Sequence, residues 1–279
     1  MIKKWLELNA IRLELNTNTM IKILKYSFYD LMRSRWSYVY LAFYMLLGFV
    51  LLFLNSDLSK ATITLMNIIV VLTPMIGTIF GIMYFYNSRE FTELLLSQPV
   101  KRSTIFLGQY LGLSLSLSMS LIIGLGIPFL MYGITQSDAV GNFITLLASG
   151  TFLTFIFVAL SLNIGLGNSN KIKGFGYAIL MWLFFAVIYD GLFMISLIVF
   201  GDYPLDKFAL GASLFNPIDL SRIMILLKLE ISALLGYTGA LFQKFFGTSS
   251  GMLISVGVLL LWVFIPVMLM LRKSLRKDF

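Results

Sequence analysis

The sequence predicts an all-α integral membrane protein with six transmembrane helices. Of its 279 residues, 59% are hydrophobic and only 12% are charged, whereas a typical soluble domain has about 25% charged residues. The hydrophobic residues form long runs, and about twenty apolar residues in a helix cross the hydrocarbon core of a bilayer. None of the runs alternates apolar and polar residues with a period of two, so a transmembrane β-barrel is not indicated.

Six apolar runs are long enough to cross a bilayer as helices. Their approximate bounds are 38–54, 61–86, 104–134, 140–166, 175–200 and 252–271. We find no internal repeat or low-complexity linker, so residues 20–279 are predicted to form one transmembrane domain. Met20 opens a stretch that resembles a natural start, and residues 1–19 would then be an N-terminal extension that is not native.

The basic residues collect at the ends of alternate runs, which is the distribution described by the positive-inside rule. On the opposite side, the loop after the first run carries only Lys60, and the loop TQSDAVGN carries no basic residue. We therefore expect a multi-pass protein of the inner (cytoplasmic) membrane with both termini in the cytoplasm. The basic residues on the predicted cytoplasmic side are Lys22, Lys25, Arg33, Arg35, Arg89, Lys101, Arg102, Lys171, Lys173, Arg272, Lys273, Arg276 and Lys277.

Residues 20–35, just before the first run, are predicted to form an amphipathic helix. A helix with one apolar and one basic face lies in the plane of the membrane interface. We therefore expect an interfacial helix on the cytoplasmic side. Its predicted apolar face consists of Ile21, Leu24, Phe28 and Leu31.

A second short amphipathic helix is predicted between the second and third runs, in the stretch NSREFTELLLSQPVKR. If residues 88–99 are helical, Arg89, Glu90 and Glu93 crowd one polar face. The opposite face would carry Phe91, Leu94 and Leu95, and Pro99 would end the helix. The plainer alternative is an ordinary charged loop, but leucines that face the cytosol favour a protein partner.

Residues 201–251 separate the fifth and sixth runs on the predicted external side. Asn216 and Pro217 are predicted to begin a helix there, because proline is tolerated in a first turn. Arg222, Lys228 and Glu230 interrupt the apolar sequence, so we do not count a seventh crossing. The predicted apolar face consists of Ile218, Ile225 and Leu229.

Asp190 is the one charged residue inside a predicted span. It is expected in the outer half of the bilayer, where a carboxylate usually faces the bundle interior or a wet cavity. One hypothesis places Asp190 in the translocation pathway or its gate. The alternative is a structural pairing with Tyr189 or with a neighbouring helix, or an outward-turned side chain.

Glycines in the second and third runs predict close helix packing and one interruption. Two G-x-x-x-G pairs allow helices to approach closely; they are Gly77 with Gly81, and Gly108 with Gly112. Near the external end of the third run, Gly124, Gly126 and Pro128 favour a kink or a re-entrant break.

Several kinds of chemistry are absent from the sequence. There is no cysteine and no histidine, which excludes disulfides, thiolate or imidazole metal ligands and Cys/His nucleophiles. No G-x-x-x-x-G-K-[ST] motif is present to cradle ATP phosphates. The fifteen methionines could bind Cu(I), but packing is the simpler interpretation. We therefore expect no catalytic, cofactor-binding or metal-binding residue in this chain.

The stretch ELLLSQPVKR followed by GQYLG resembles the corresponding segment of ABC-2 type transporter permeases, in which the loop after the second span is the coupling helix seated in the ATPase. The resemblance implies a cytoplasmic ABC ATPase dimer, which would bind ATP and Mg, and a second copy of this chain. Gln109 departs from the pattern, since many members have lysine there. The implied ATPase-coupling residues are Arg89, Glu90, Phe91, Glu93, Leu94, Leu95, Leu96, Ser97 and Pro99.

The stretches FNPIDLSRIMILL and LLGYTGALFQKFFG are similar to the external segment of the permeases of nitrous oxide reductase maturation (NosY-like). That similarity implies a homodimer that serves copper-site (sulfur/copper) maturation and a periplasmic β-helical partner protein on the external side. Alternatives are an ABC-2 permease that exports another cargo (drug, lipid or polysaccharide) and a non-transporting membrane scaffold; no nucleic acid is expected. The implied external partner-binding residues are Asn216, Pro217, Asp219, Arg222, Tyr237 and Thr238.

Overall fold

The structure, a computed structural model, describes residues 2–55, 58–137, 139–200, 206–228 and 249–276. Every element in these ranges is helical, and six helices are long and apolar enough to cross a membrane. The prediction of an all-α, multi-pass membrane protein is confirmed. The crossings are α2 (Arg35–Leu54), α3 (Leu58–Asn87), α5 (Arg102–Met131), α6 (Val140–Gly167), α7 (Lys171–Leu183) continued by α8 (Tyr189–Val199), and α12 (Ser249–Arg276).

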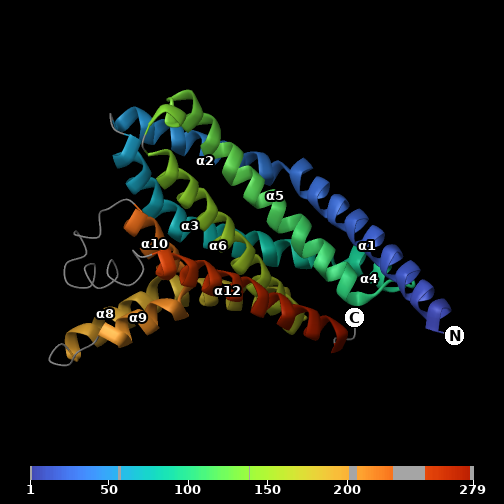
Figure 1. The fold of residues 1–279 in the computed structure, drawn as a ribbon. Coiled ribbons are helices and arrows are strands. Elements are labelled where there is room, and N and C mark those ends of the chain that lie inside the picture. The colour runs from blue at the N-terminus through green and yellow to red at the C-terminus, as the bar shows by residue number, and fades with distance from the viewer. Residues whose placement is uncertain (1, 56–57, 138, 201–205, 229–248, 277–279) are drawn as a thin grey trace.

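The remaining helical elements are shorter or lie outside the crossings (Figure 1). Helix α1 precedes the first crossing, α4 joins the second to the third, and α9 and α10 lie between the fifth and the sixth. A π-helical turn, η2, interrupts the fifth crossing between α7 and α8. Their bounds are α1 (Ile2–Arg33), α4 (Arg89–Leu96), η1 (Ile134–Gln136), η2 (Phe184–Ile188), α9 (Asp206–Phe215) and α10 (Pro217–Lys228).

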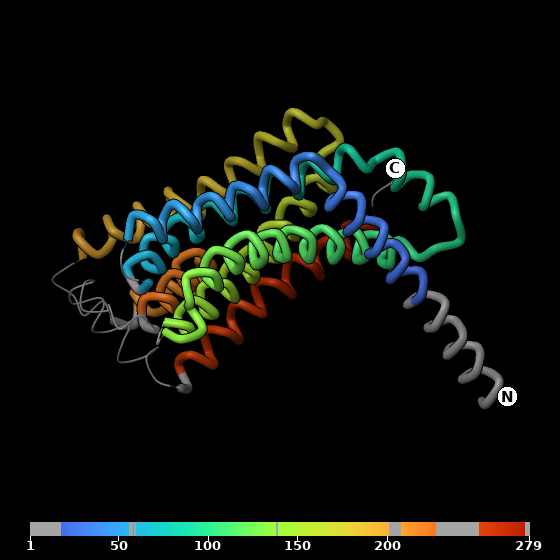
Figure 2. The backbone as a smooth tube through the Cα atoms, turned by 90° about the horizontal axis from the view of Figure 1, so that it is seen from above, coloured from blue at the N-terminus to red at the C-terminus, as the bar shows by residue number. Residues whose placement is uncertain are grey.

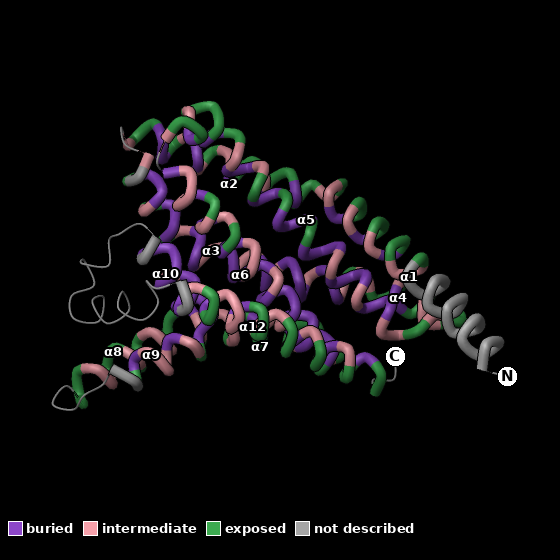
Figure 3. The backbone as a smooth tube through the Cα atoms, in the orientation of Figure 1, coloured by how far each residue is buried: buried purple, intermediate pink, exposed green. Residues whose placement is uncertain are grey.

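Helices α3, α5 and α6 form the core of the bundle (Figure 3). More than half of the most apolar window of each is buried, compared with 11% for the crossing made by α7 and α8. Leu65, Leu117 and Phe157, one from each core helix, are fully buried. The α7–α8 crossing therefore stands at the periphery of the chain.

Both G-x-x-x-G pairs are sites of close helix packing, as predicted. A Cβ atom on Gly81 of α3 would collide with the Ser161 side chain of α6. On α5, a Cβ atom on Gly112 would lie 2.7 Å from the Leu24 carbonyl oxygen of α1. The small residues thus allow α3 to pack on α6 and α1 to pack on α5.

Helix α1 packs lengthwise against α5 (Figures 1 and 2). The predicted apolar face was wrong in part, because Ile21 is exposed, whereas Ile23, Ser27 and Leu31 are buried. The Ser27 hydroxyl accepts a 2.9 Å hydrogen bond from Tyr84 of α3. The periodicity of large apolar residues could not predict the buried face of α1, because that face includes the small polar residue Ser27.

The re-entrant break predicted as one possibility in the third crossing is wrong, because α5 continues as one helix to Met131; the alternative of a kink stays a prediction. A Cβ atom on Gly124 would lie 2.8 Å from the Tyr44 side chain, and one on Gly48 would lie 3.0 Å from the Pro128 ring. These residues therefore serve the packing of α5 on α2. The chain turns only after α5, at Gly133, where φ is +81°, a conformation that favours glycine.

Candidate functional site

The ends of five crossings, α3, α5, α6, α7 and α12, lie with helix α4 at one end of the bundle, which we call the basic end. Lys171 Nζ lies 3.4 Å from Asn87 Oδ1, and Lys273 Nζ lies 3.3 Å from the Asn163 carbonyl oxygen. Helix α4 follows directly on Asn87 and leads into α5. The basic end is the side that the charge distribution predicts to be cytoplasmic.

Helix α4 is shorter than the predicted helix over residues 88–99. It ends at Leu96, and Ser97 Oγ donates a 2.8 Å hydrogen bond to the Leu94 carbonyl oxygen. Residues 97–99 then form a turn that leads past Pro99 toward α5. Arg89 and Glu93 form the expected i,i+4 ion pair, with a 2.8 Å separation between Nε and Oε1.

One side of α4 is fastened to α5 and α1. Thr92 is buried, and its hydroxyl accepts a 2.8 Å hydrogen bond from Gln109 Nε2 of α5. The Phe91 ring stacks on the Tyr26 ring of α1, with centroids 4.4 Å apart. A displacement of α4 would therefore act on both helices.

The other side of α4 is exposed at the basic end. Arg89, Glu90 and Glu93 are exposed, and Leu94 is 58% exposed. Ser97 and Pro99 are also exposed, whereas Leu95 and Leu96 are half-buried. The prediction that Phe91, Leu94 and Leu95 share one apolar face is wrong, because Phe91 contacts α1 and Leu94 points outward. The exposed surface of α4 consists of Leu94 surrounded by charged side chains, and such a surface suits a polar protein partner.

Helices α9 and α10 form a bent pair with an angle of 114° between them. Helix α10 begins at Pro217, as predicted. It is not a surface helix with one apolar face, because Leu220 and Ser221 are fully buried together with Ile218 and Ile225. Leu229, Tyr237 and Thr238 lie outside the described residues.

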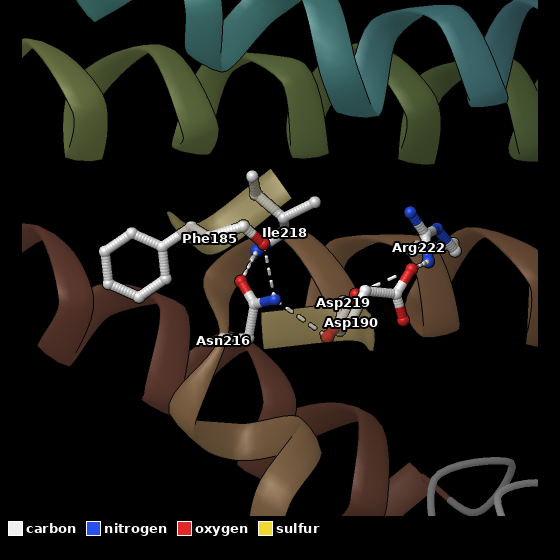
Figure 4. A network of polar contacts seen from close by, with 6 residues as sticks. All are labelled: Phe185, Asp190, Asn216, Ile218, Asp219 and Arg222. Atoms are coloured by element: carbon white, nitrogen blue, oxygen red, sulfur yellow. Dashed lines mark hydrogen bonds and ion pairs between the residues drawn. The ribbon is translucent and has the colours of Figure 1, made fainter. Parts of the chain in front are cut away.

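A polar network joins α10 to the fifth crossing (Figure 4). Arg222 Nη1 lies 3.0 Å from Asp190 Oδ2 and 3.4 Å from Asp219 Oδ1. Asn216 Nδ2 donates to Asp219 Oδ2 over 2.8 Å and to the Phe185 carbonyl oxygen over 2.9 Å. Asp190 is thus paired with a neighbouring helix, and its role in a pathway or gate stays a prediction.

One guanidinium serves two carboxylates in this network. Asn216 is fully buried and Asp219 nearly so. These two residues therefore hold α10 in place, and the predicted role of this segment in partner binding stays a prediction.

Several residues of both regions could not be found from sequence spacing. Tyr26 and Gln109 hold α4, while Tyr189 and Trp262 hold the corner between α9 and α10. Each of them contacts an element distant in the sequence. Among the described residues, no group of three or more Asp or Glu side chains comes together that could hold a metal ion.

Comparison with known proteins agrees with the resemblance seen at α4 and in the external segment. The chain is 27% identical over 145 residues to a probable ABC transporter permease protein NosY of Pseudomonas aeruginosa, which covers 50% of this chain and 53% of the relative. It is 28% identical over 179 residues to a protein of the same name from Stutzerimonas stutzeri, and this match covers 62% of this chain and 58% of the relative.

The chain thus spans a little over half the length of the curated relatives it matches. No protein-family model matches the chain. Taken with the six crossings and the short helix between the second and the third, these two matches confirm that this chain is similar to ABC transporter permeases of the NosY type.

Proposed function

We propose that this chain is the membrane permease subunit of an ABC transporter and that α4 couples it to a separate ATPase subunit. The observation that carries the proposal is the two-sided environment of α4. Its inner side is fastened to α5 through Thr92 and to α1 through Phe91, while its outer side offers exposed charges and Leu94. The similarity to proteins named as NosY permeases supports the same function.

In this proposal the chain binds no nucleotide, and a cytoplasmic ABC ATPase dimer binds ATP and Mg. Two copies of the chain form a homodimer in the inner membrane. Closure of the ATPase dimer pushes on α4, and the push reaches α5 through the hydrogen bond between Gln109 and Thr92. Because α5 is a continuous helix over Arg102–Met131, it carries the displacement to the opposite end of the bundle.

The biological role that we propose is copper-site maturation of nitrous oxide reductase. The support is the similarity to two proteins named NosY and the resemblance of FNPIDLSRIMILL and LLGYTGALFQKFFG to the external segment of NosY-like permeases. The chain would act by transporting a sulfur species or by transmitting force to a periplasmic β-helical partner. Tyr237 and Thr238 are the residues that we propose for contact with that partner.

Co-purification from detergent-solubilised membranes tests the coupling role. The variant Glu93→Lys with Leu94→Asp changes two exposed residues of α4, so the membrane bundle should assemble normally. We expect this variant to lose a co-purifying subunit that carries ATP-binding motifs, as identified by mass spectrometry. The matched control, Asp30→Lys with Ile21→Asp, alters two exposed residues of α1 and should retain that subunit. Equal recovery of the ATPase with both variants would remove the coupling role.

A further inference from the structure

The fifth crossing changes helix type in its middle. Over Phe184–Ile188 the helix is π-helical. The Tyr189 N–H donates to the Phe184 carbonyl oxygen, five residues back, and not to Phe185, its acceptor in an α-helix. The turn therefore holds one more residue than an α-helical turn, and the Phe185 carbonyl oxygen loses its usual donor.

Asn216 supplies a replacement donor from the start of α10. Its Nδ2 donates to the Phe185 carbonyl oxygen over 2.9 Å and to Asp219 Oδ2 over 2.8 Å. Its Oδ1 accepts a 3.1 Å hydrogen bond from the Ile218 N–H, which caps the first turn of α10. The side chain is fully buried, so these hydrogen bonds are not exchanged with water.

Helix α10 contacts the fifth crossing a second time, just beyond the π-helical turn. Arg222 pairs with Asp190 over 3.0 Å, so the two contacts of α10 lie on either side of the additional residue. An α-helix advances about 100° per residue. If the turn became α-helical, Asp190 would rotate by about 100° relative to Phe185, and α10 could not keep both contacts.

Two aromatic side chains form hydrogen bonds to the end of α9, where the chain bends into α10 next to this turn. The Tyr189 hydroxyl donates to the Ala212 carbonyl oxygen over 2.6 Å. Trp262 Nε1 donates to the Leu214 carbonyl oxygen over 3.1 Å, and the Trp262 ring meets the Phe185 ring edge-on with centroids 5.5 Å apart. Two carbonyl groups at the end of α9 thus accept hydrogen bonds from the fifth and sixth crossings. The corner between α9 and α10 is therefore attached next to the π-helical turn η2.

We propose that Asn216 is a register lock for the fifth crossing. While α10 is seated, Asn216 holds Phe184–Ile188 in the π-helical form and Asp190 faces Arg222. When α10 withdraws, the turn becomes α-helical and Asp190 rotates away from Arg222. The position of α10, between the fifth and sixth crossings, thereby determines which way the Asp190 carboxylate faces within the membrane. The lock involves no contact of α4, so it stands independently of the proposed ATPase coupling.

A double-mutant cycle on the purified full-length chain tests the lock. Deletion of Val187, which is 57% exposed, removes the additional residue of the turn, restores a backbone donor to Phe185 and keeps Asp190 facing α10. Asn216→Ser keeps a hydroxyl that can cap α10 but is too short to reach Phe185. The measured quantity is the midpoint of thermal unfolding in detergent.

In the unaltered chain we expect Asn216→Ser to lower that midpoint by about 4 °C, because a buried carbonyl group loses its donor. In the chain without Val187 the same substitution should have about half of that effect, because the backbone then serves the Phe185 carbonyl and only the hydrogen bond to Asp219 is lost. Equal effects in the two backgrounds would overturn the lock. Asn170→Ser is the control, since Asn170 caps α7 in the same way and is exposed; it should leave the midpoint unchanged.

A cross-linking measurement decides the matter if the deletion variant does not fold. The natural chain has no cysteine, so Asp190→Cys with Arg222→Cys introduces a unique pair. A short bifunctional thiol reagent should join the two positions when Asn216 is present. Adding Asn216→Ser should reduce the cross-linked fraction at least about threefold, whereas Asn170→Ser should not. An unchanged fraction with Asn216→Ser would contradict the rotation of Asp190.

Discussion

Helices α4 and α10 are both short and carry charged residues, yet their charges lie in different environments. In α4 the ion pair is local, between Arg89 and Glu93, and both side chains are exposed. In α10 the cation Arg222 reaches to Asp190 on another helix and is partly buried. The charges of α4 thus satisfy each other at the surface, whereas Arg222 joins α10 to the fifth crossing in addition to its local pair with Asp219.

The two helices also differ in how they are attached. Helix α4 depends on α1 and α5 through one ring stack and one hydrogen bond between side chains. Helix α10 is packed within the bundle, and its first residues are held by the fifth crossing. The few contacts on one side of α4 suit its proposed role of transmitting a displacement. The burial of α10 on all sides suits its proposed role of fixing the helical register of the fifth crossing.

The largest expected loss of stability comes from disrupting the contact between α1 and α5, the two helices to which α4 is attached. Gly112→Leu would force the Leu24 backbone and the Ser27 side chain of α1 away from α5, at a cost of about 3 kcal/mol in the free energy of unfolding. The yield of monodisperse protein in size-exclusion chromatography should fall sharply. Gly126→Leu on the same helix is the control, because a Cβ atom there would meet nothing within 4 Å. Similar losses for both variants would mean that the α1–α5 contact has no special role.

A smaller effect is expected from breaking each ion pair. Arg222→Leu leaves Asp190 and Asp219 without their cation in a partly buried site, which should cost about 2 kcal/mol of stability. Arg89→Leu removes one partner of an exposed i,i+4 pair and should cost less than about 0.5 kcal/mol. Denaturation of the two variants in the same detergent measures the difference. If Arg89→Leu destabilised the protein as much as Arg222→Leu, the contrast between the two helices would not hold.

The smallest effect concerns the hydrogen bond that attaches α4 to α5. Gln109→Leu removes the donor to Thr92 and should weaken the attachment by about 1 kcal/mol. Hydrogen–deuterium exchange over Arg89–Leu96 should become faster by about fivefold, while exchange in α10 stays the same. Gln98→Leu is the matched control, since Gln98 is exposed in the turn after α4. Faster exchange in both variants would indicate that any change in this loop loosens α4.

The sequence predicts the elements better than it predicts their contacts. Each crossing is a long apolar run whose length alone identifies it, and Pro99 correctly limits the helix before α5. By contrast, the π-helical turn at Phe184–Ile188 carries no proline or glycine, and its partner Asn216 lies about thirty residues away. The re-entrant break expected near Pro128 was wrong, and the proline ring packs instead against Gly48 of α2, a contact that no pattern within the third run encodes.

The same limit applies within the candidate site. The i,i+4 spacing of Arg89 and Glu93 predicts their ion pair, because both residues belong to one helix. The stack of Phe91 on Tyr26 and the exposure of Leu94 depend on where α1 lies, and no pattern within α4 encodes that position. Sequence reasoning therefore predicts the helix and its ion pair but assigns Phe91 to the wrong side, and the docking role of the helix stays a prediction.

The most direct test of the account is site-specific photocross-linking from the exposed side of α4. A photoreactive amino acid at Leu94 should yield, in native membranes, a covalent adduct with an ATPase subunit. The same group at Leu130, which is as exposed as Leu94 but lies at the opposite end of the bundle, should yield none. If the purified complex retains its ATPase and position 94 gives no adduct with it, α4 is not the coupling element.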